Sequence, residues 1–443
     1  MTVCNRYAIR SAFFDIVAPA ENPQQIVEHA RYIDDGVLLI DKGNIVGLFP
    51  WQQGEAHVKE GWSLMDYRGK IILPGFIDTH IHFPQAEIIG AYGEQLLEWL
   101  QRYTFPAESQ YGDMHYATRM AAFFLQQLLS NGTTSAMVFA TVHPESVEAL
   151  FTAAEGLGMR LIAGKVMMDC NAPDNLVETA ESSHRQSQAL IRRWHGRGRL
   201  GYAITPRFAP TSTPELLNAA QRLCDEFPDT WLQTHLSENP QEVAWVRELY
   251  PDRDSYLDVY HHYRLTGRRS VFAHSIHLDD AEWDCLHQTQ SAVAFCPSSN
   301  LFLGSGLFRL QQSWHKGVRI GIGTDVGAGT SFSLLQTLGD AYKVGQLQQY
   351  RLSACEAFYH VTLGGACALD LAHEIGNFST GKTADFVVID PAVTPLQRLR
   401  DDKCQDIMER LFVLMTLGDD RNVVATWVNG RPVWQADCQE VAA

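Results

Sequence analysis

The sequence predicts an α/β fold in which a (β/α)8 TIM-like barrel carries a smaller β-sandwich domain built from both chain termini. Short apolar runs alternate with amphipathic stretches through the middle of the 443 residues, as in repeated βα units. The span from His80 to Asp325, which follow the first and last of these runs, is close to the ~250 residues typical of such a barrel. Both chain ends show strand-like segments separated by turn residues.

The two chain ends are expected to pair with each other. Residues 1–73 and 376–443 are the two parts of the predicted β-sandwich domain. In the second part, Asn429-Gly430 separates two short apolar segments, and this dipeptide favours a type I′ hairpin turn. The strands expected in this domain include residues 36–40, 44–49, 384–389, 425–428 and 431–434.

The predicted barrel covers residues 74–375. Its helices are indicated by apolar spacing between the strands, for example over residues 145–158, which end in glycine. The connection from Pro84 to Gly112 is longer than an ordinary βα loop, so we expect it to fold over the barrel mouth. The eight expected strands cover residues 70–78, 134–139, 160–168, 201–205, 231–234, 271–273, 292–295 and 318–323.

Composition excludes several classes of partner. A net charge of −16 opposes phosphate backbones and anionic lipid, so we expect neither a nucleic-acid nor a membrane partner. The nine cysteines are scattered, odd in number and never spaced C-x-x-C, which argues against a disulfide scaffold and a cysteine zinc site. No secretory signal or transmembrane segment is recognised, and a cytoplasmic location is expected.

Four histidines and an aspartate follow the predicted barrel strands. His80 and His82 are two apart, so on a strand both side chains point the same way. His235, His274 and Asp325 each end a later strand, and active sites of this fold lie at that end. Neutral imidazole and carboxylate are metal ligands, and the set therefore predicts a metal centre. Taken singly, these residues would read as core histidines and a turn aspartate.

Glu238 lies three residues beyond His235 and is close enough to a metal-bound water to act as a proton shuttle. The alternative is a solvated loop carboxylate that favours the N-terminus of the helix expected near Pro240. We favour the shuttle because of the neighbouring cluster.

The motifs resemble those of a known family. Pro74-Gly-Phe-Ile-Asp-Thr-His-Ile-His82 is similar to the opening signature of the amidohydrolase superfamily, and the later His, His and Asp complete its pattern. Within that superfamily the chain resembles the guanine deaminase family over nearly its whole length. The segments that carry this resemblance are His80-Ile-His-Phe-Pro-Gln85, Tyr92-Gly-Glu-Gln-Leu-Leu-Glu-Trp-Leu100, Gly164-Lys-Val-Met-Met-Asp169, Ile204-Thr-Pro-Arg-Phe-Ala-Pro210, His235-Leu-Ser-Glu238 and Gly323-Thr-Asp-Val-Gly-Ala-Gly329.

The resemblance implies zinc-dependent deamination of guanine to xanthine and ammonia, by metal-activated hydroxide with Glu238 as proton shuttle. It implies one zinc per subunit, with Fe²⁺ or Mn²⁺ not excluded, and a homodimer. The expected metal ligands are His80, His82, His235 and Asp325. The expected catalytic residues are Glu238, His274 and Asp325. The expected substrate contacts are Gln85, Arg207, Phe208, His235, Glu238 and Asp325.

Some alternatives stay open at this point. His277 competes with His274, but the family pattern favours His274; Lys165, in a strand, is given no role. A related aminohydrolase or chlorohydrolase acting on another purine, a pyrimidine or a triazine would keep the same metal set. An inactive amidohydrolase-like scaffold is a second alternative, which the intact ligand set disfavours.

Overall fold

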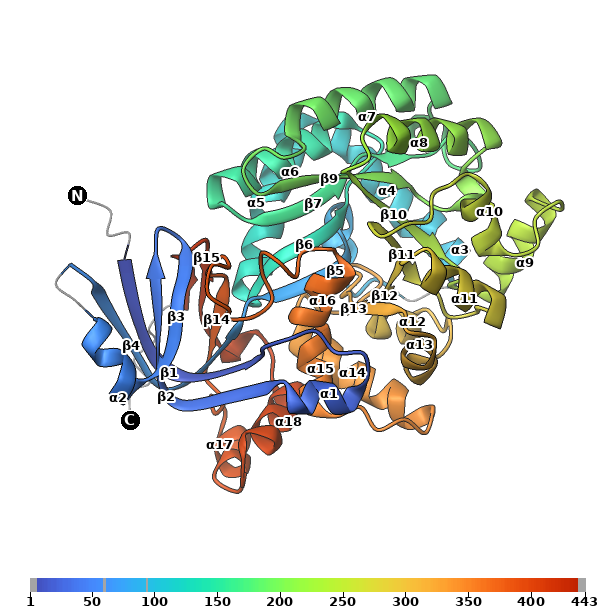
Figure 1. Cartoon of the computed structure of the whole chain (residues 1–443). Helices are drawn as coiled ribbons and strands as arrows, with labels where there is room; N and C mark the ends of the chain where they lie inside the picture. Colours follow the sequence, from blue (N-terminus) through green and yellow to red (C-terminus); the bar gives the residue numbers. More distant parts are fainter. Residues whose placement is uncertain (1–5, 59–60, 93–94, 437–443) are drawn as a thin grey trace.

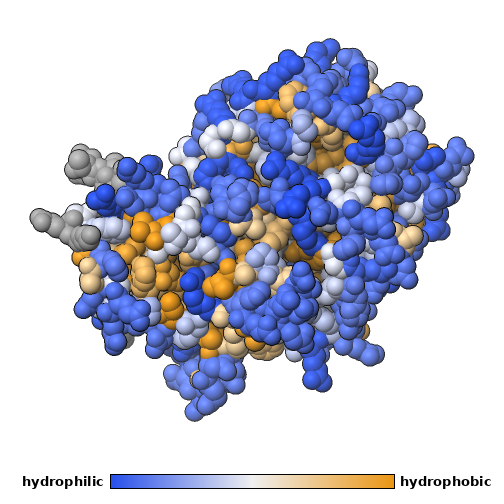
Figure 2. Space-filling model, viewed as in Figure 1, coloured by the Kyte–Doolittle hydropathy of each residue, from blue (hydrophilic) through white to orange (hydrophobic). Residues whose placement is uncertain are grey.

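The computed structural model describes residues 6–58, 61–92 and 95–436. The chain forms a barrel of parallel strands surrounded by helices and, beside it, a separate sheet made from both ends of the sequence (Figure 1). Hydrophilic side chains predominate over the outer helices of the barrel, and hydrophobic ones gather over part of the separate sheet (Figure 2).

The separate sheet joins the two ends of the chain. Its strand order is β16-β15-β14-β4-β1-β2-β3. The first and last parts of the sequence meet where β4 pairs antiparallel with β14, with Ile72 opposite Val388. The expected hairpin is present, because Asn429 and Gly430 both have positive φ, as a type I′ turn requires. The strands are β1 (Arg6–Ile16), β2 (Ala30–Asp41), β3 (Asn44–Pro50), β4 (Ser63–Pro74), β14 (Phe386–Ile389), β15 (Val423–Val428) and β16 (Arg431–Gln435).

This sheet curls around its own apolar core. Tyr7 of β1 and Trp427 of β15 are three strands apart, which in a flat sheet would separate them by about 14 Å. Their ring centroids lie only 5.1 Å apart. The edge strand β3 also approaches the segment before β14, since the amide of Ile45 donates to the carbonyl of Lys382 (2.8 Å). One continuous curled sheet therefore builds the sandwich-like domain.

The barrel has the eight expected parallel strands, in the order β13-β12-β11-β10-β9-β7-β6-β5, and a short β8 pairs with β9. Its first and last strands meet where the amide of Asp325 donates to the carbonyl of His80 (2.9 Å) and the amide of His82 to Val326 (3.0 Å). The strands are β5 (Phe76–His82), β6 (Thr133–Phe139), β7 (Arg160–Gly164), β8 (Val166–Met167), β9 (Leu200–Pro206), β10 (Trp231–Leu236), β11 (Ser270–His274), β12 (Ala292–Phe295) and β13 (Arg319–Ile322).

The first expected barrel strand is divided in the structure. Residues 71–73 belong to β4 of the terminal sheet, and β5 of the barrel begins only at Phe76. Gly75 lies between the two strands, where a Cβ would come within 2.1 Å of Thr134 Oγ1. The apolar run is continuous in sequence because both strands are buried, so hydrophobicity does not mark the change of sheet.

Helices cover the outside of the barrel. The α6 helix ends at Gly158 in the left-handed conformation (φ 71°), as its sequence predicts. The main helices are α5 (Met114–Ser130), α6 (Pro144–Leu157), α7 (Ala180–Trp194), α8 (Pro214–Glu226), α9 (Pro240–Leu249), α10 (Tyr256–His262), α11 (Asp280–Gln288), α12 (Pro297–Phe302), α13 (Leu310–Lys316), α14 (Leu334–Leu347), α15 (Ala354–His360), α16 (Leu363–Ala368), α17 (Pro395–Asp401) and α18 (Ile407–Leu417).

The long connection after β5 consists of short helical turns. They are η2 (Phe83–Ile88), α3 (Leu96–Trp99), η3 (Leu100–Thr104), α4 (Phe105–Glu108) and η4 (Ser109–Gly112). In the described part of the chain no helix is long and apolar enough to cross a membrane. The cysteines there are free thiols, whereas Cys4 and Cys438 lie outside the described residues.

Candidate active site

The expected metal ligands converge at the C-terminal end of the barrel strands. His80 and His82 end β5, His235 is near the end of β10, and Asp325 follows β13. Asp325 Oδ1 lies 3.3 Å from Nε2 of both His80 and His82. Nε2 of His82 and His235 are 3.2 Å apart. Three imidazole nitrogens and a carboxylate oxygen thus face one small region.

The hydrogen bonding of these groups fits a cation. His235 Nδ1 donates to the carbonyl of Arg207 (2.8 Å), so its Nε2 presents a lone pair to the cluster. His80 Nε2 is buried and makes no hydrogen bond. Burial lowers the pKa of His82 to about 3 and, together with the neighbouring imidazoles, lowers that of His235 well below its usual value. Both rings are therefore neutral, the form that binds a metal.

His274 and Glu238 lie beside the ligand set. His274 Nε2 is 3.4 Å from Glu238 Oε2 and 3.7 Å from Asp325 Oδ2. His274 Nδ1 donates to Asn300 Oδ1 (2.9 Å), which leaves Nε2 as an acceptor. Burial, with the nearby charge of Asp325, raises the pKa of Glu238 to about 8. Glu238 is therefore an acid at neutral pH and is well placed to give up a proton.

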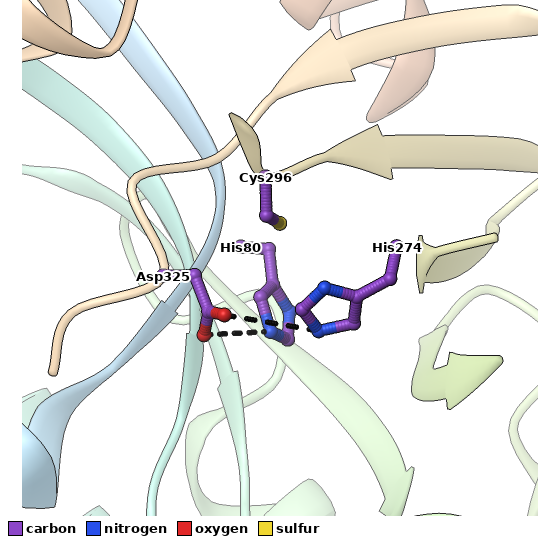
Figure 3. Close-up of side chains that lie close together, drawn as sticks. All are labelled: His80, His274, Cys296 and Asp325. Atoms are coloured by element: carbon purple, nitrogen blue, oxygen red, sulfur yellow. Dashed lines mark ion pairs between the residues drawn. The ribbon is translucent and has the colours of Figure 1, made fainter. Parts of the chain in front are cut away.

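Figure 3 shows His80, His274 and Asp325 converging, with Cys296 above the His80 side chain. The cysteine sulfur lies within 4.8 Å of a ligand atom of each of these three residues. Its thiol donates to the carbonyl of Ala294 (3.5 Å), and burial raises its pKa well above the usual value. Cys296 therefore packs beside His80 as a neutral thiol. The sequence analysis did not single out Cys296. Its position directly after the expected strand of residues 292–295 would have indicated that it lies near the other strand-end residues.

Two residues that carry the centre adopt a strained backbone. His274 has φ 68° and Asp325 has φ 52°, in the left-handed region that costs an ordinary side chain about 1–2 kcal/mol. Both lie where a barrel strand has just ended. Such conformations persist where the surrounding structure enforces them, and they cluster at functional sites.

A buried acid that the sequence analysis did not single out holds the turn that carries Glu238. Glu242 Oε2 accepts from the amides of Glu238 (2.9 Å) and Asn239 (3.1 Å). Its Oε1 accepts from the hydroxyl of Tyr256 (2.7 Å). Ser305 Oγ donates to Glu238 Oε1 (3.2 Å). The carboxyl group of Glu238 is thus fixed from both its backbone and its side chain.

A small pocket opens onto the ligand set. Its lining contains every expected substrate contact. Its apolar wall includes Leu96, Trp99 and Leu100, so the long connection does fold over the barrel mouth. The lining residues are His82, Gln85, Leu96, Trp99, Leu100, Arg207, Phe208, His235, Glu238, His274, Leu303, Asp325 and Ala328.

Arg207 and Gln85 line the same pocket as the ligand set. Arg207 NH1 donates to both oxygens of Glu108 (2.8 Å each), and its guanidinium lies 5.6 Å from the ring centre of Phe105. Gln85 Oε1 accepts from the amide of Gly327 (3.3 Å). Burial raises the pKa of Glu108, while Arg207 and a hydrogen bond from Gln85 oppose this effect. Sequence reasoning missed Glu108, because nothing marks it within the long connection.

Comparison with known proteins agrees with this geometry. Residues 71–433 match the model of the amidohydrolase family. The chain belongs to the amidohydrolase family. It is 59% identical to the guanine deaminase of Escherichia coli (strain K12), over 97% of this chain and 98% of that protein.

Solved structures of this family share the fold. An E. coli guanine deaminase structure covers 98% of this chain and 99% of its own, with a TM-score of 0.95 and 57% identity. A guanine deaminase from C. acetobutylicum with guanine bound in its active site covers 97% and 100%, with a TM-score of 0.88 and 28% identity.

Two side chains left open by the sequence lie away from the centre of this amidohydrolase. His277 is exposed, and its Nε2 donates to the carbonyl of Ser305 (2.9 Å). Lys165 is buried, but its Nζ pairs with Glu178 and donates to the carbonyl of Val166 (3.1 Å). The buried lysine is therefore engaged in an ion pair outside the metal-type cluster.

Proposed function

We propose that this amidohydrolase hydrolyses guanine to xanthine and ammonia, which balances as guanine plus water giving xanthine plus NH₃. The observation that carries the proposal is one pocket that joins the imidazole-carboxylate cluster, the acid Glu238 and the guanidinium of Arg207. The similarity to guanine deaminases supports it, because it extends over nearly the whole chain.

We propose zinc as the resident metal, with Fe²⁺ or Mn²⁺ as alternatives that the same ligands accept. His80, His82, His235 and Asp325 would hold it. The fit rests on the bare Nε2 of His80 and on the fixed tautomer of His235. When bound, such a metal lowers the pKa of water so that a nucleophile exists at neutral pH.

The remaining chemistry falls to side chains of this protein. Asp325 Oδ2 accepts the proton of the attacking water, which His274 Nε2 orients as a hydrogen-bond acceptor. Glu238 then gives its proton to the ring nitrogen beside the carbon under attack. A second proton reaches the leaving nitrogen, the bond from carbon to that nitrogen breaks, and ammonia departs. These roles place His274, Glu238 and Asp325 as the catalytic residues.

Substrate binding uses other residues of the pocket lining. Arg207 donates to the carbonyl at C6 of the purine, and Gln85 offers both an amide donor and an acceptor. Phe208, which is 4% exposed, presents its ring to the heterocycle. Leu96, Trp99 and Leu100 limit access of water from the mouth of the barrel.

We also propose that the protein is a cytoplasmic homodimer and that the barrel domain spans residues 74–375. The cysteines are scattered, and those in the described part of the chain are unbridged, which supports a reducing compartment. The end of β4 at Pro74 supports the first domain boundary. Light scattering after gel filtration tests the dimer: a single peak at the monomer mass, 49.7 kDa, would contradict it.

The proposed reaction is tested by ammonia release from guanine, with cytosine, adenine and a triazine in parallel. We expect turnover of guanine alone, loss of turnover on chelation and recovery with zinc. Glu238→Gln should abolish turnover, whereas Glu87→Gln, an exposed carboxylate in the same long connection as Gln85, should leave it unchanged. Metal-loaded protein that turns over none of these compounds would contradict the proposal.

A further inference from the structure

Glu108 is a fully buried acid whose contacts are explained neither by the catalytic steps nor by packing alone. It is the last residue of α4, in the long connection after β5, and its exposed fraction is 0%. It does not line the pocket, but it hydrogen-bonds two residues that do, Arg207 and Gln85. A group in this position acts on the substrate only through those two side chains.

The contact with Arg207 determines which donors face the pocket. A guanidinium has five N–H donors in a planar fork. NH1 of Arg207 is used by both Glu108 oxygens, and the ring of Phe105 lies beside the guanidinium. The donors on Nε and NH2 are therefore left for a ligand, and the plane of the fork is fixed by contacts on two sides.

The contact with Gln85 determines which way its amide points. A carboxylate only accepts hydrogen bonds, so the amide nitrogen of Gln85 must face Glu108. The amide of Gly327 only donates, so the Gln85 oxygen must face Gly327, as its 3.3 Å contact with Oε1 confirms. Glu108 and the Gly327 amide therefore favour the same orientation of the Gln85 amide.

We propose that Glu108 is a specificity-determining positioning residue, which orients Arg207 and Gln85 so that the pocket selects heterocycles bearing a ring carbonyl opposite Arg207. This rests on the proposed function, since it assigns the substrate preference of the same pocket. A site built to hydrogen-bond a substrate group rejects an analogue that lacks the group, because its own buried donors then stay unpaired. Glu108 keeps those donors fixed in place, so the cost of leaving them unpaired cannot be relieved by rotation.

The test compares the binding of hypoxanthine and purine to the zinc-loaded protein by calorimetry. Both lack the amine that is released, and they differ by the carbonyl at C6. We expect the unsubstituted protein to bind hypoxanthine at least about 100-fold more tightly. Glu108→Gln should reduce this preference at least tenfold, raise the KM for guanine at least tenfold and change kcat less than threefold. Glu87→Gln is the matched control and should leave all three values unchanged.

Other outcomes overturn the proposal. A preference for hypoxanthine that survives in Glu108→Gln, or one that is absent from the unsubstituted protein, would show that Glu108 does not set specificity. A fall in kcat at constant KM would assign it to the chemical step. If Glu108→Gln fails to fold, Glu108→Asp keeps the charge but withdraws it by one methylene, and an unchanged preference there overturns the proposal. Failure of guanine turnover would contradict the proposed reaction alone, because the binding comparison does not depend on it.

Discussion

The two ends of the barrel use polar residues in opposite ways. At the C-terminal end, some buried polar atoms lack a hydrogen-bond partner within the protein, as Nε2 of His80 and Nε2 of His274 do. At the N-terminal end, arginines that begin strands are bound by the segment before β14. Arg160 NH2 lies 3.1 Å from Glu374, Arg199 pairs with Glu374 and Asp385, and Arg319 NH1 donates to the carbonyl of Cys367 (2.7 Å).

This difference separates function from stability. Buried polar groups cost free energy when unpaired, so two unpaired imidazole nitrogens gathered beside one pocket indicate that a ligand completes them. At the other end, ion pairs join the barrel to the chain that leads into the terminal sheet. Substitutions at the first end should thus reduce activity with little loss of stability, and substitutions at the second end should do the reverse.

The largest expected effect comes from Asp325→Asn. The amide removes the charge that faces His80, His82 and His274, and it cannot accept the proton of the attacking water. We expect metal affinity to fall more than about 100-fold and kcat by about 10³-fold or more. Metal content measured by mass spectrometry and ammonia release measured on the same sample check both values.

The melting temperature of the metal-free protein is the control for Asp325→Asn and should change little. Retention of a full metal equivalent together with normal turnover would remove Asp325 from the centre.

Asp385→Asn probes the opposite end. The Asp385 carboxylate pairs with Arg199 (NH2 to Oδ2, 2.5 Å) and accepts from the amide of Asn429 (2.8 Å). Breaking this buried pair leaves Arg199 with Glu374 as its remaining ion-pair partner, so we expect the free energy of unfolding to fall by about 3 kcal/mol, the low end for a broken buried pair. Urea unfolding measures this loss. The kcat for guanine at 20 °C should stay within twofold of the unsubstituted value, and a large drop in kcat would break the comparison between the two ends.

Sequence patterns predicted what is local and periodic. The alternation along a strand placed His80 and His82 on one side, and the strand ends brought His235, His274 and Asp325 to the same face of the barrel. Eight apolar runs gave the eight strands because buried parallel strands are continuously hydrophobic. These features depend on backbone geometry, which short segments determine.

What the sequence did not predict depends on contacts between distant segments. Asn300 fixes the tautomer of His274, and Glu108 orients Arg207, but each pair comes from different elements at unrelated spacings. The division at Gly75 between two sheets was hidden for a similar reason, since β4 and β5 are equally buried on both sides of it. Only the tertiary structure specifies such pairings.

A smaller effect at the C-terminal end is expected from Phe208→Leu. The ring of Phe208 lines the pocket and lies 6.5 Å from that of His235 in an edge arrangement. Leucine fills most of the volume but offers no aromatic face, which costs about 1 kcal/mol of stacking. We expect KM for guanine to rise about fivefold to tenfold with kcat nearly constant. Steady-state rates measured over a range of guanine concentrations give both constants. A fivefold to tenfold fall in kcat at constant KM would assign Phe208 to the chemical step instead.

A pH dependence of stability is expected to belong to Glu242. Burial raises the pKa of Glu242 from 4.5 to about 7. Between these two values the folded protein holds a proton that the unfolded chain has lost. The free energy of unfolding contributed by Glu242 is therefore greatest below pH 4.5 and falls as pH rises to 7, by at most about 1.4 kcal/mol per pH unit. Above pH 7 it is constant.

Glu242→Gln removes this titration while keeping the size of the side chain. Unfolding measured in urea at pH 5, 6, 7 and 8 should show the stability of the unsubstituted protein declining relative to the variant up to pH 7 and then running parallel to it. Other titrating groups cancel in the difference, since both proteins contain them. Parallel curves over the whole range would show that Glu242 is already ionised at pH 5. The Glu242 carboxylate would then hold the Glu238 turn as a permanent anion through the two backbone amides that it binds.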